Sequence, residues 1–124
     1  MKKRILVVDD EKSFTRMLKL NLEETGKYEV RTENKGTKTL LAAKEFKPDL
    51  ILLDVLMPDM DGGWAASQIL ADKSVENIPI VFLTAVTTKE ETDARCKIIG
   101  GKTFMAKPVR IKKLIECIEE NIIK

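Results

Sequence analysis

Histidine is absent from this 124-residue chain, cysteine occurs only twice, and aromatic residues make up 5% of the sequence. The lack of histidine excludes Ser-His-Asp and Cys-His catalysis and disfavours a zinc site. Cys96 and Cys117 have no CxxC spacing, which predicts two buried thiols rather than a disulfide and fits a reducing cytoplasm. Long uncharged apolar runs are also missing, so we expect no membrane-spanning segment. Any chemistry must therefore use carboxylates, hydroxyls and lysines.

The length of the chain predicts a single domain that covers residues 1–124. The formal net charge of +2 is too small to indicate nucleic-acid binding. Lys2-Lys3-Arg4 is followed by only four apolar residues before Asp9, so we expect no signal peptide. A cytoplasmic domain that does not bind nucleic acid directly is the resulting expectation.

Several short apolar runs end at a polar residue. A run buried on both faces predicts a strand of a parallel sheet. If these strands are parallel, carboxylates, a hydroxyl and an ammonium meet at one edge of the sheet. The runs and their ends are residues 5–8 before Asp9-Asp10, residues 50–53 before Asp54, residues 80–83 before Thr84, and residues 103–106 before Lys107-Pro108.

Helical spacing of apolar residues fills the segments between these strands. Alternation of strands and helices predicts an α/β fold with a five-stranded parallel sheet, doubly wound in three α/β/α layers, with the flavodoxin-like order 2-1-3-4-5. The ligand site of such a sheet lies where the strand order reverses, between the first and third strands. The predicted elements are helices over residues 11–25, 37–46, 62–70 and 111–122, a helix from Thr87 or Thr88 to Gly100-Gly101, and a second strand over residues 28–33.

Three carboxylates, those of Asp9, Asp10 and Asp54, are expected at that reversal point. Because like charges repel, either their pKa values rise or a cation neutralises them. Oxygen-only ligands favour a hard cation, and Mg²⁺ above all. A carboxylate can also act as a nucleophile toward phosphorus when positive charge and hydrogen-bond donors neutralise the transferred group. Lys107 and Thr84 are placed to provide that neutralisation.

Five separated signatures follow one another along the chain: Asp9-Asp10, Asp54, Met57-Pro58 with Asp61-Gly62, Thr84-Ala85, and Lys107-Pro108. Together they closely resemble the receiver domain of two-component response regulators, of the single-domain chemotaxis-regulator type. The resemblance spans essentially the whole chain. It implies a phospho-accepting signalling module that is not an enzyme in the usual sense, because it would catalyse only its own phosphorylation and dephosphorylation.

The resemblance also implies roles for individual residues. Asp54 would be the phosphoacceptor, and Thr84 and Lys107 would contact the phosphoryl oxygens. Asp9, Asp10, Asp54 and the backbone carbonyl of Leu56 would bind Mg²⁺. Thr84 and Phe104 would form the switch between inactive and active states. The Lys107-Pro108 peptide bond would be cis.

Partners follow from the same resemblance. A histidine kinase or histidine phosphotransfer protein would supply the phosphoryl group, docking near Phe14, Met17 and Leu18 and near Pro108-Val109. A downstream output domain or protein would contact the surface of the fourth helix, fifth strand and fifth helix. Gly101-Lys102-Thr103 replaces the acidic pair found in receivers that dimerise for DNA binding, so we expect a monomer.

Other functions remain to be compared with this one. A phosphorylation-independent protein-interaction domain on the same fold stays open. A phosphohydrolase is disfavoured because Leu56 occupies the place of its general acid. A flavodoxin-like cofactor binder is disfavoured because the loop after the first strand is acidic, and an EF-hand is excluded because Met57 and Gln68 occupy ligand positions. Asp59 and Asp61 are interpreted as loop and helix-cap carboxylates.

Overall fold

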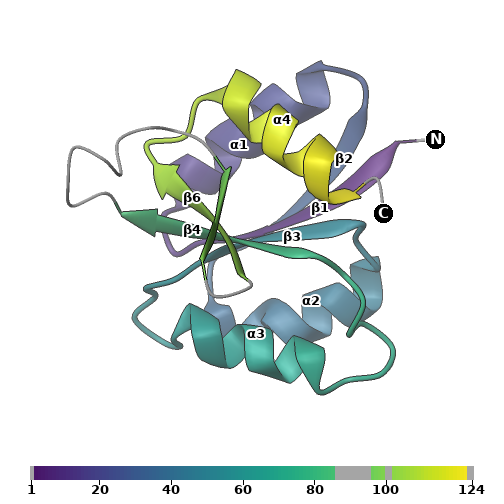
Figure 1. The fold of residues 1–124 in the computed structure, drawn as a ribbon, viewed down its shortest axis with the longest axis vertical. Coiled ribbons are helices and arrows are strands. Elements are labelled where there is room, and N and C mark those ends of the chain that lie inside the picture. Colours follow the sequence, from purple (N-terminus) through teal and green to yellow (C-terminus); the bar gives the residue numbers. More distant parts are fainter. Residues whose placement is uncertain (1, 86–95, 100–101, 123–124) are drawn as a thin grey trace.

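A computed structural model describes residues 2–85, 96–99 and 102–122 of the chain (Figure 1). A central sheet separates two layers of helices in it. The five parallel strands run in the order β2-β1-β3-β4-β6, and a sixth strand, β5, lies antiparallel to β6 at the edge. The strands are β1 (Lys3–Val8), β2 (Tyr28–Glu33), β3 (Leu50–Asp54), β4 (Ile80–Ala85), β5 (Cys96–Ile99) and β6 (Lys102–Lys107).

The helices cover both faces of the sheet. Helices α1 (Lys12–Glu24) and α4 (Ile111–Ile122) lie above it in Figure 1, and α2 (Thr39–Phe46) and α3 (Gly62–Leu70) lie below. A short 3₁₀ helix, η1 (Gly36–Lys38), precedes α2. In the part of the chain that the structure describes, no helix combines the length and apolar content that a bilayer crossing requires.

Alternate residues of each strand supply the two cores. On β1, Ile5 and Val7 belong to the core under α1 and α4, whereas Leu6 and Val8 belong to the core above α2 and α3. This two-residue period explains why β1 and β3 read as unbroken apolar runs, since both faces of each strand are buried. The five parallel strands, their order and the three layers confirm the predicted fold.

The predicted fourth helix is wrong over its last residues. Residues 86–95 lie outside the described part of the chain, and Cys96–Ile99 forms β5 instead of helix. The β-branched side chains of Ile98 and Ile99 suit a strand, and β6 offers that strand an edge for pairing. The Gly-Gly dipeptide between β5 and β6 in the sequence is as typical of a hairpin connection as of a helix end, so the sequence signal was ambiguous.

Cys117 also differs from expectation. Its side chain is buried on α4, but it is disulfide-bonded rather than a free thiol. The prediction relied on sequence spacing, which does not report which elements come together in space. The cysteine content therefore no longer supports a reducing compartment.

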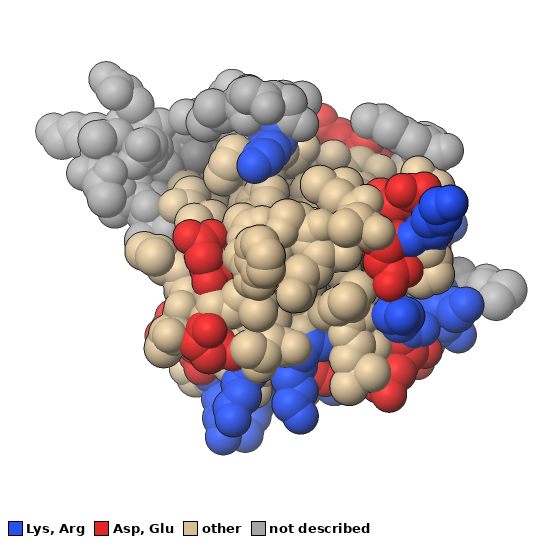
Figure 2. All heavy atoms as spheres, turned by 90° about the horizontal axis from the view of Figure 1, so that it is seen from below, with Lys and Arg blue, Asp and Glu red and all other residues tan. Residues whose placement is uncertain are grey.

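The face of the molecule made by α2 and α3 is uncharged at its centre, with acidic and basic side chains around it (Figure 2). Leu41 on α2 and Trp64 and Leu70 on α3 are each more than half exposed. Leu56, between β3 and α3, is 76% exposed. These four residues are exposed large apolar side chains on α2, α3 and the β3–α3 connection.

Gly62 begins α3 directly against the end of β3. Its amide donates to the carbonyl of Val55 at 2.9 Å, and a Cβ added to Gly62 would lie 2.2 Å from the carbonyl oxygen of Asp54. Backbone cannot rotate away as a flexible side chain can, so a methyl group here forces β3 and α3 apart. Glycine at this position thus allows the close approach of the strand end and the helix.

We expect Gly62→Ala to lower the free energy of unfolding by about 1–3 kcal/mol, the usual range for overpacking. Urea unfolding followed by circular dichroism measures this. Gly63→Ala is the matched control, because its Cβ would meet only the Asp61 side chain, at 3.0 Å. That variant also gains helix propensity, so it should stay within about 1 kcal/mol of the wild type. Equal stability of the two variants would show that the contact with Asp54 is not limiting.

Candidate functional site

Three aspartates meet at the carboxyl end of the sheet. Asp9 follows β1, Asp10 comes next, and Asp54 is the last residue of β3. One carboxylate oxygen of each lies within 4.8 Å of the others. Asp9 is fully buried and Asp54 is 5% exposed, whereas Asp10 is exposed. The cluster therefore has a buried base and one side open to solvent.

The register of the sheet explains this meeting. Val8 of β1 pairs with Leu53 of β3, so the residues that follow them, Asp9 and Asp54, lie at the same level. Asp54 pairs in turn with Leu83 of β4, which precedes Thr84. Parallel strands end at a common edge, and the polar residue after each apolar run is carried there.

Lys107, the last residue of β6, reaches back into this cluster. Its Nζ lies 2.6 Å from Asp9 Oδ2 and 3.4 Å from Asp54 Oδ1. The ammonium also lies 4.7 Å from the centroid of the Phe14 ring, within the range of a cation–π contact. Only 18% of the lysine side chain is exposed. One ammonium thus bridges the two buried carboxylates.

Burial and charge shift the pKa values of this site. Burial raises the pKa of Asp54 to about 6, the charge of Asp9 adds to the effect, and Lys107 opposes it. For Lys107, burial acts to lower the pKa, but the hydrogen bond and charge of Asp9, with the charge of Asp54, outweigh it and raise the pKa. Lys107 therefore stays protonated at neutral pH, whereas ionisation of Asp54 is less favourable than that of an exposed carboxyl group.

The donor set fits a hard divalent cation. Asp9 Oδ2 is buried and faces the Lys107 ammonium at 2.6 Å. The other oxygen, Oδ1, accepts from the Glu11 amide at 2.9 Å, which fixes the carboxylate plane. All three side chains offer oxygen alone, the donor type that Mg²⁺ prefers.

Asp59 and Asp61 serve the loop rather than this cluster. Asp59 accepts from the amides of Gly36 and Thr37 and from the Thr37 hydroxyl, each at 3.0 Å. These bonds, led by the one from the Thr37 amide, lower the pKa of Asp59. Asp61 caps α3 by accepting from the Gly63 amide at 2.6 Å. Both carboxylates match the interpretation as loop and cap groups.

The other predicted site residues lie around the cluster. Thr84 is half-buried near the end of β4 and pairs with Ala106, next to Lys107. Phe104 pairs with Phe82 of β4, and their rings stack with centroids 5.3 Å apart. The Lys107-Pro108 peptide bond is cis, the isomer that the resemblance implies. The Leu56 side chain points to solvent, so only its backbone is available to the site.

Asn34, which follows β2, was missed by the sequence analysis. Its Nδ2 donates to the backbone carbonyl of Asp9 at 2.8 Å and to Thr15 Oγ1 at 3.0 Å. It thereby ties the acidic loop to the first turn of α1. The only sequence signal was its place after a strand, which many turn residues share. Leu18, expected among the docking residues, is fully buried, so that expectation is wrong for this residue.

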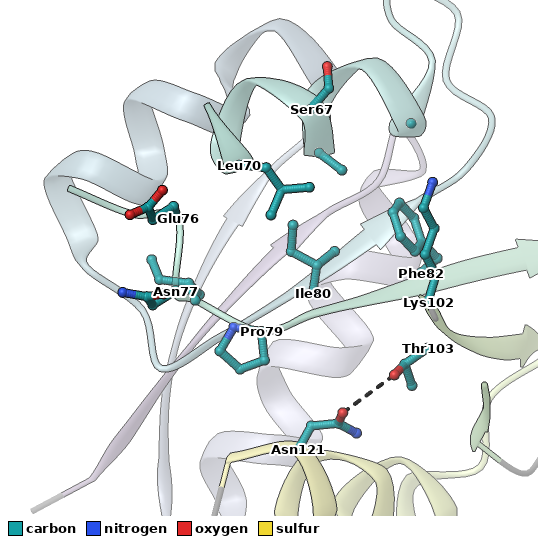
Figure 3. Close-up of a pocket in the computed structure, with 13 residues that line it drawn as sticks. Ser67, Leu70, Glu76, Asn77, Pro79, Ile80, Phe82, Lys102, Thr103 and Asn121 are labelled. Carbon is teal, nitrogen blue, oxygen red and sulfur yellow. Dashed lines mark hydrogen bonds between the residues drawn. The ribbon is translucent and has the colours of Figure 1, made fainter. Parts of the chain in front are cut away.

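A hollow of about 470 Å³ lies apart from the carboxylates, between α3 and the starts of β4 and β6 (Figure 3). Leu70, Ile80 and Phe82 form its apolar wall, and Thr103 and Asn121 close one side through a 3.5 Å hydrogen bond. None of the three clustered aspartates lines it. We therefore assign the candidate site to the acidic edge of the sheet.

Comparison with known proteins agrees with this geometry. The sequence matches the response regulator receiver domain family over residues 5–119. PhoP of Bacillus subtilis, an alkaline phosphatase synthesis transcriptional regulatory protein, is 42% identical over 109 residues, which cover 87% of this chain and 43% of PhoP. The chain thus spans less than half the length of PhoP. Protein PilH of Pseudomonas aeruginosa is 38% identical over 118 residues and is covered over 93% of both chains.

A solved structure shows the same likeness in three dimensions. The chemotaxis protein CheY4 of Vibrio cholerae matches with a TM-score of 0.81 at 27% identity, covering 98% of this chain and 99% of that chain. The matched residues 5–119 include every aspartate of the cluster and Lys107. By its sequence, its sheet order and the aspartates gathered at the end of that sheet, this chain belongs to the response regulator receiver domain family.

Proposed function

We propose that Asp54 is the residue that accepts the phosphoryl group in this signalling module, and that a histidine kinase or histidine phosphotransfer protein supplies that group. One observation carries the proposal: the Asp54 carboxylate ends the central strand β3 within 4.8 Å of two other carboxylates and 3.4 Å from an ammonium. A nucleophile flanked by a metal-binding cluster and a cation is what phosphoryl transfer requires. Receiver domains are signalling modules rather than classical enzymes, and this one would catalyse only reactions of its own side chain.

Asp9, Asp10 and Asp54, with the backbone carbonyl of Leu56, are the residues that would hold Mg²⁺. The gathering of one oxygen from each of the three carboxylates within 4.8 Å of the others supports this assignment. Bound there, Mg²⁺ would offset the negative charge of the carboxylates and of the incoming phosphoryl oxygens. Asp10, the exposed member, faces the solvent from which the ion and the donor arrive.

The transfer itself uses groups of this chain. An Asp54 carboxylate oxygen attacks phosphorus, a new O–P bond forms, and the bond between phosphorus and the donor breaks with its electron pair leaving on the donor. Lys107 pairs with one phosphoryl oxygen, and the Thr84 hydroxyl donates to another. The ammonium already spans Asp9 and Asp54 at 2.6 and 3.4 Å, so it needs little movement.

A change of packing at Phe104 would report phosphorylation. The ring stacks on Phe82 and is half-buried. When Thr84 moves toward the phosphoryl group, the space beside it opens to an aromatic ring. Full switching requires phosphorylation to favour the active state by about 5 kcal/mol. The output surface would include β6 and α4, while most of the predicted fourth helix lies outside the described residues.

Docking and location complete the proposal. The phosphodonor protein would contact α1 through Phe14 and Met17, which are half-buried, and the segment after Lys107 through Pro108 and Val109. A monomer in the cytoplasm, in contact with a kinase and an output partner, is the working state. The cytoplasmic location rests on the family match. The cysteine content does not support it, because Cys117 is disulfide-bonded.

We expect wild-type protein with Mg²⁺ and acetyl phosphate to gain the mass of one phosphoryl group, and Asp54→Asn to gain none. The amide is a poor nucleophile, while its size and shape are kept. Intact-protein mass spectrometry measures both, and chelation of Mg²⁺ should abolish labelling.

Asp59→Asn is the matched control, because Asp59 is a nearby carboxylate that bonds η1 and not the cluster. It should label like the wild type. Labelling of Asp54→Asn at the wild-type rate would refute the assignment. No labelling of any variant would instead favour a phosphorylation-independent interaction domain on the same fold.

The raised pKa of Asp54 predicts a pH-dependent stability in protein free of divalent cations. A carboxyl group whose pKa rises from 3.8 to about 6 on folding stabilises the fold below pH 4, and this contribution is lost as the pH rises through 6. Asp54→Asn cannot ionise, so relative to the wild type it should gain about 2–3 kcal/mol between pH 4 and pH 7. Urea unfolding in EDTA across this range measures the difference.

Asp59→Asn should show the opposite sign. The pKa of Asp59 is lowered by its bonds to η1, so its carboxylate stabilises the fold above its unfolded pKa and loses that effect on acidification. The variant should therefore be less stable than the wild type at pH 7 and approach it in acid. A pH-independent difference for Asp54→Asn would contradict the raised pKa.

A further inference from the structure

A second hollow, of about 300 Å³, lies between α1 and the edge strand β2, and every ionisable residue that lines it is a cation. Lys12, Arg16 and Lys19 come from α1. Thr32 and Asn34, from the end of β2 and just beyond it, supply polar groups on the opposite wall. A hollow with this lining carries an excess of positive charge.

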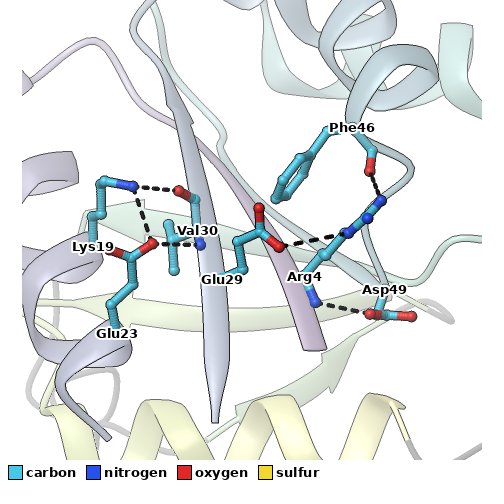
Figure 4. A network of polar contacts seen from close by, with 7 residues as sticks. All are labelled: Arg4, Lys19, Glu23, Glu29, Val30, Phe46 and Asp49. Atoms are coloured by element: carbon cyan, nitrogen blue, oxygen red, sulfur yellow. Dashed lines mark hydrogen bonds and ion pairs between the residues drawn. The ribbon is translucent and has the colours of Figure 1, made fainter. Parts of the chain in front are cut away.

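Lys19 is the one cation of the three that is already neutralised. Its Nζ donates to the Val30 carbonyl at 2.7 Å and pairs with Glu23 at 3.1 Å, and Glu23 also accepts from the Val30 amide (Figure 4). The side chains of Lys12 and Arg16 have no hydrogen bond or ion pair to any residue that the structure describes. Two unpaired cations thus remain beside the hollow.

The positions of these two cations are unfavourable for the helix that carries them. Lys12 is the first residue of α1, whose first turn contains no acidic residue. A cation at a helix N-terminus opposes the helix dipole, and like charges four residues apart, as Lys12 and Arg16 are, repel each other. Departures from such charge preferences of helices are expected mainly at functional sites. An anion in the hollow would relieve both effects.

The wall of the hollow is held in place before any ligand arrives. Thr15 is 2% exposed, and its hydroxyl lies between the Lys12 carbonyl at 3.1 Å and Asn34 Nδ2 at 3.0 Å. Asn34 is fixed a second time by its bond to the Asp9 carbonyl. A wall of this kind loses little conformational entropy when a ligand binds.

We propose that this hollow is a binding site for a small oxyanion, a phosphate or carboxylate group, with Arg16 and Lys12 as its principal contacts. The guanidinium of Arg16 offers paired N–H donors that match two oxygens of either group. The volume lies at the lower end of the range for ligand sites, so a compact anion fits best. The site is separate from Asp54, and the proposal does not depend on phosphorylation.

Titration of ¹⁵N-labelled full chain with inorganic phosphate, in EDTA and at constant ionic strength set with NaCl, tests the proposal. We expect saturable amide shifts over residues 12–19 and at Thr32 and Asn34. Sodium acetate in a parallel titration separates the two chemistries: a response to both indicates a general oxyanion site, and a response to phosphate alone indicates a phosphate site.

Arg16→Gln should weaken phosphate binding about tenfold or more, the loss expected when a charged hydrogen-bonding pair is removed. Arg110→Gln is the matched control, since Arg110 is exposed, lies outside the hollow and undergoes the same change of charge. Lys12→Gln gives a second, independent measurement. Amide shifts that do not saturate, or equal phosphate binding by Arg16→Gln and Arg110→Gln, would overturn the proposal. Either result would mean that the shifts come from ionic screening. Asp54→Asn should bind phosphate here as the wild type does, which separates this test from that of the phosphoacceptor.

Discussion

Parallel alignment of β1, β3, β4 and β6 is the constraint on which the site depends. Strands β1, β3 and β4 contain buried apolar runs, whereas β6 is mostly half-buried. A polar residue lies at the end of each strand, so their common direction carries those polar residues to one edge. Asp9 and Asp54 become neighbours although 45 residues separate them in the sequence. Lys107, from the far side of the central strands, then bridges them. A reversed strand would remove its polar residue from the site.

Burial gives this edge its chemistry. Asp9 and Asp54 are almost fully covered, so burial raises the pKa of Asp54 to about 6, and the charge of Asp9 adds to the rise. The loop beside them is held from two directions, by Gly62 against the end of β3 and by Asp59 bonded to η1. The site therefore combines a buried carboxylate of raised pKa with a neighbouring loop that is anchored at Gly62 and Asp59.

Much of this arrangement could be predicted from the sequence, because apolar runs ending in Asp9, Asp54, Thr84 and Lys107 are local patterns with a simple consequence in a parallel sheet. What failed depended on tertiary contacts. No local pattern predicts that Asn34 donates a hydrogen bond to the Asp9 carbonyl. Cys117 forms a disulfide that the cysteine spacing did not indicate. Cys96–Ile99 pairs with β6, where a helix was expected. Short segments that suit two structures are decided by their neighbours.

The net negative charge of the carboxylate cluster affects how an anionic phosphodonor would approach the site. Three carboxylates surround a single ammonium, so the open side around Asp10 presents an excess of negative charge to solvent. Under the proposed function, a doubly charged phosphodonor approaching from that side would be repelled until a divalent cation neutralised the cluster. Binding of the metal ion would therefore raise the rate of encounter with the phosphodonor, before it affects bond formation. This effect would be larger at low salt, where the charges are less screened.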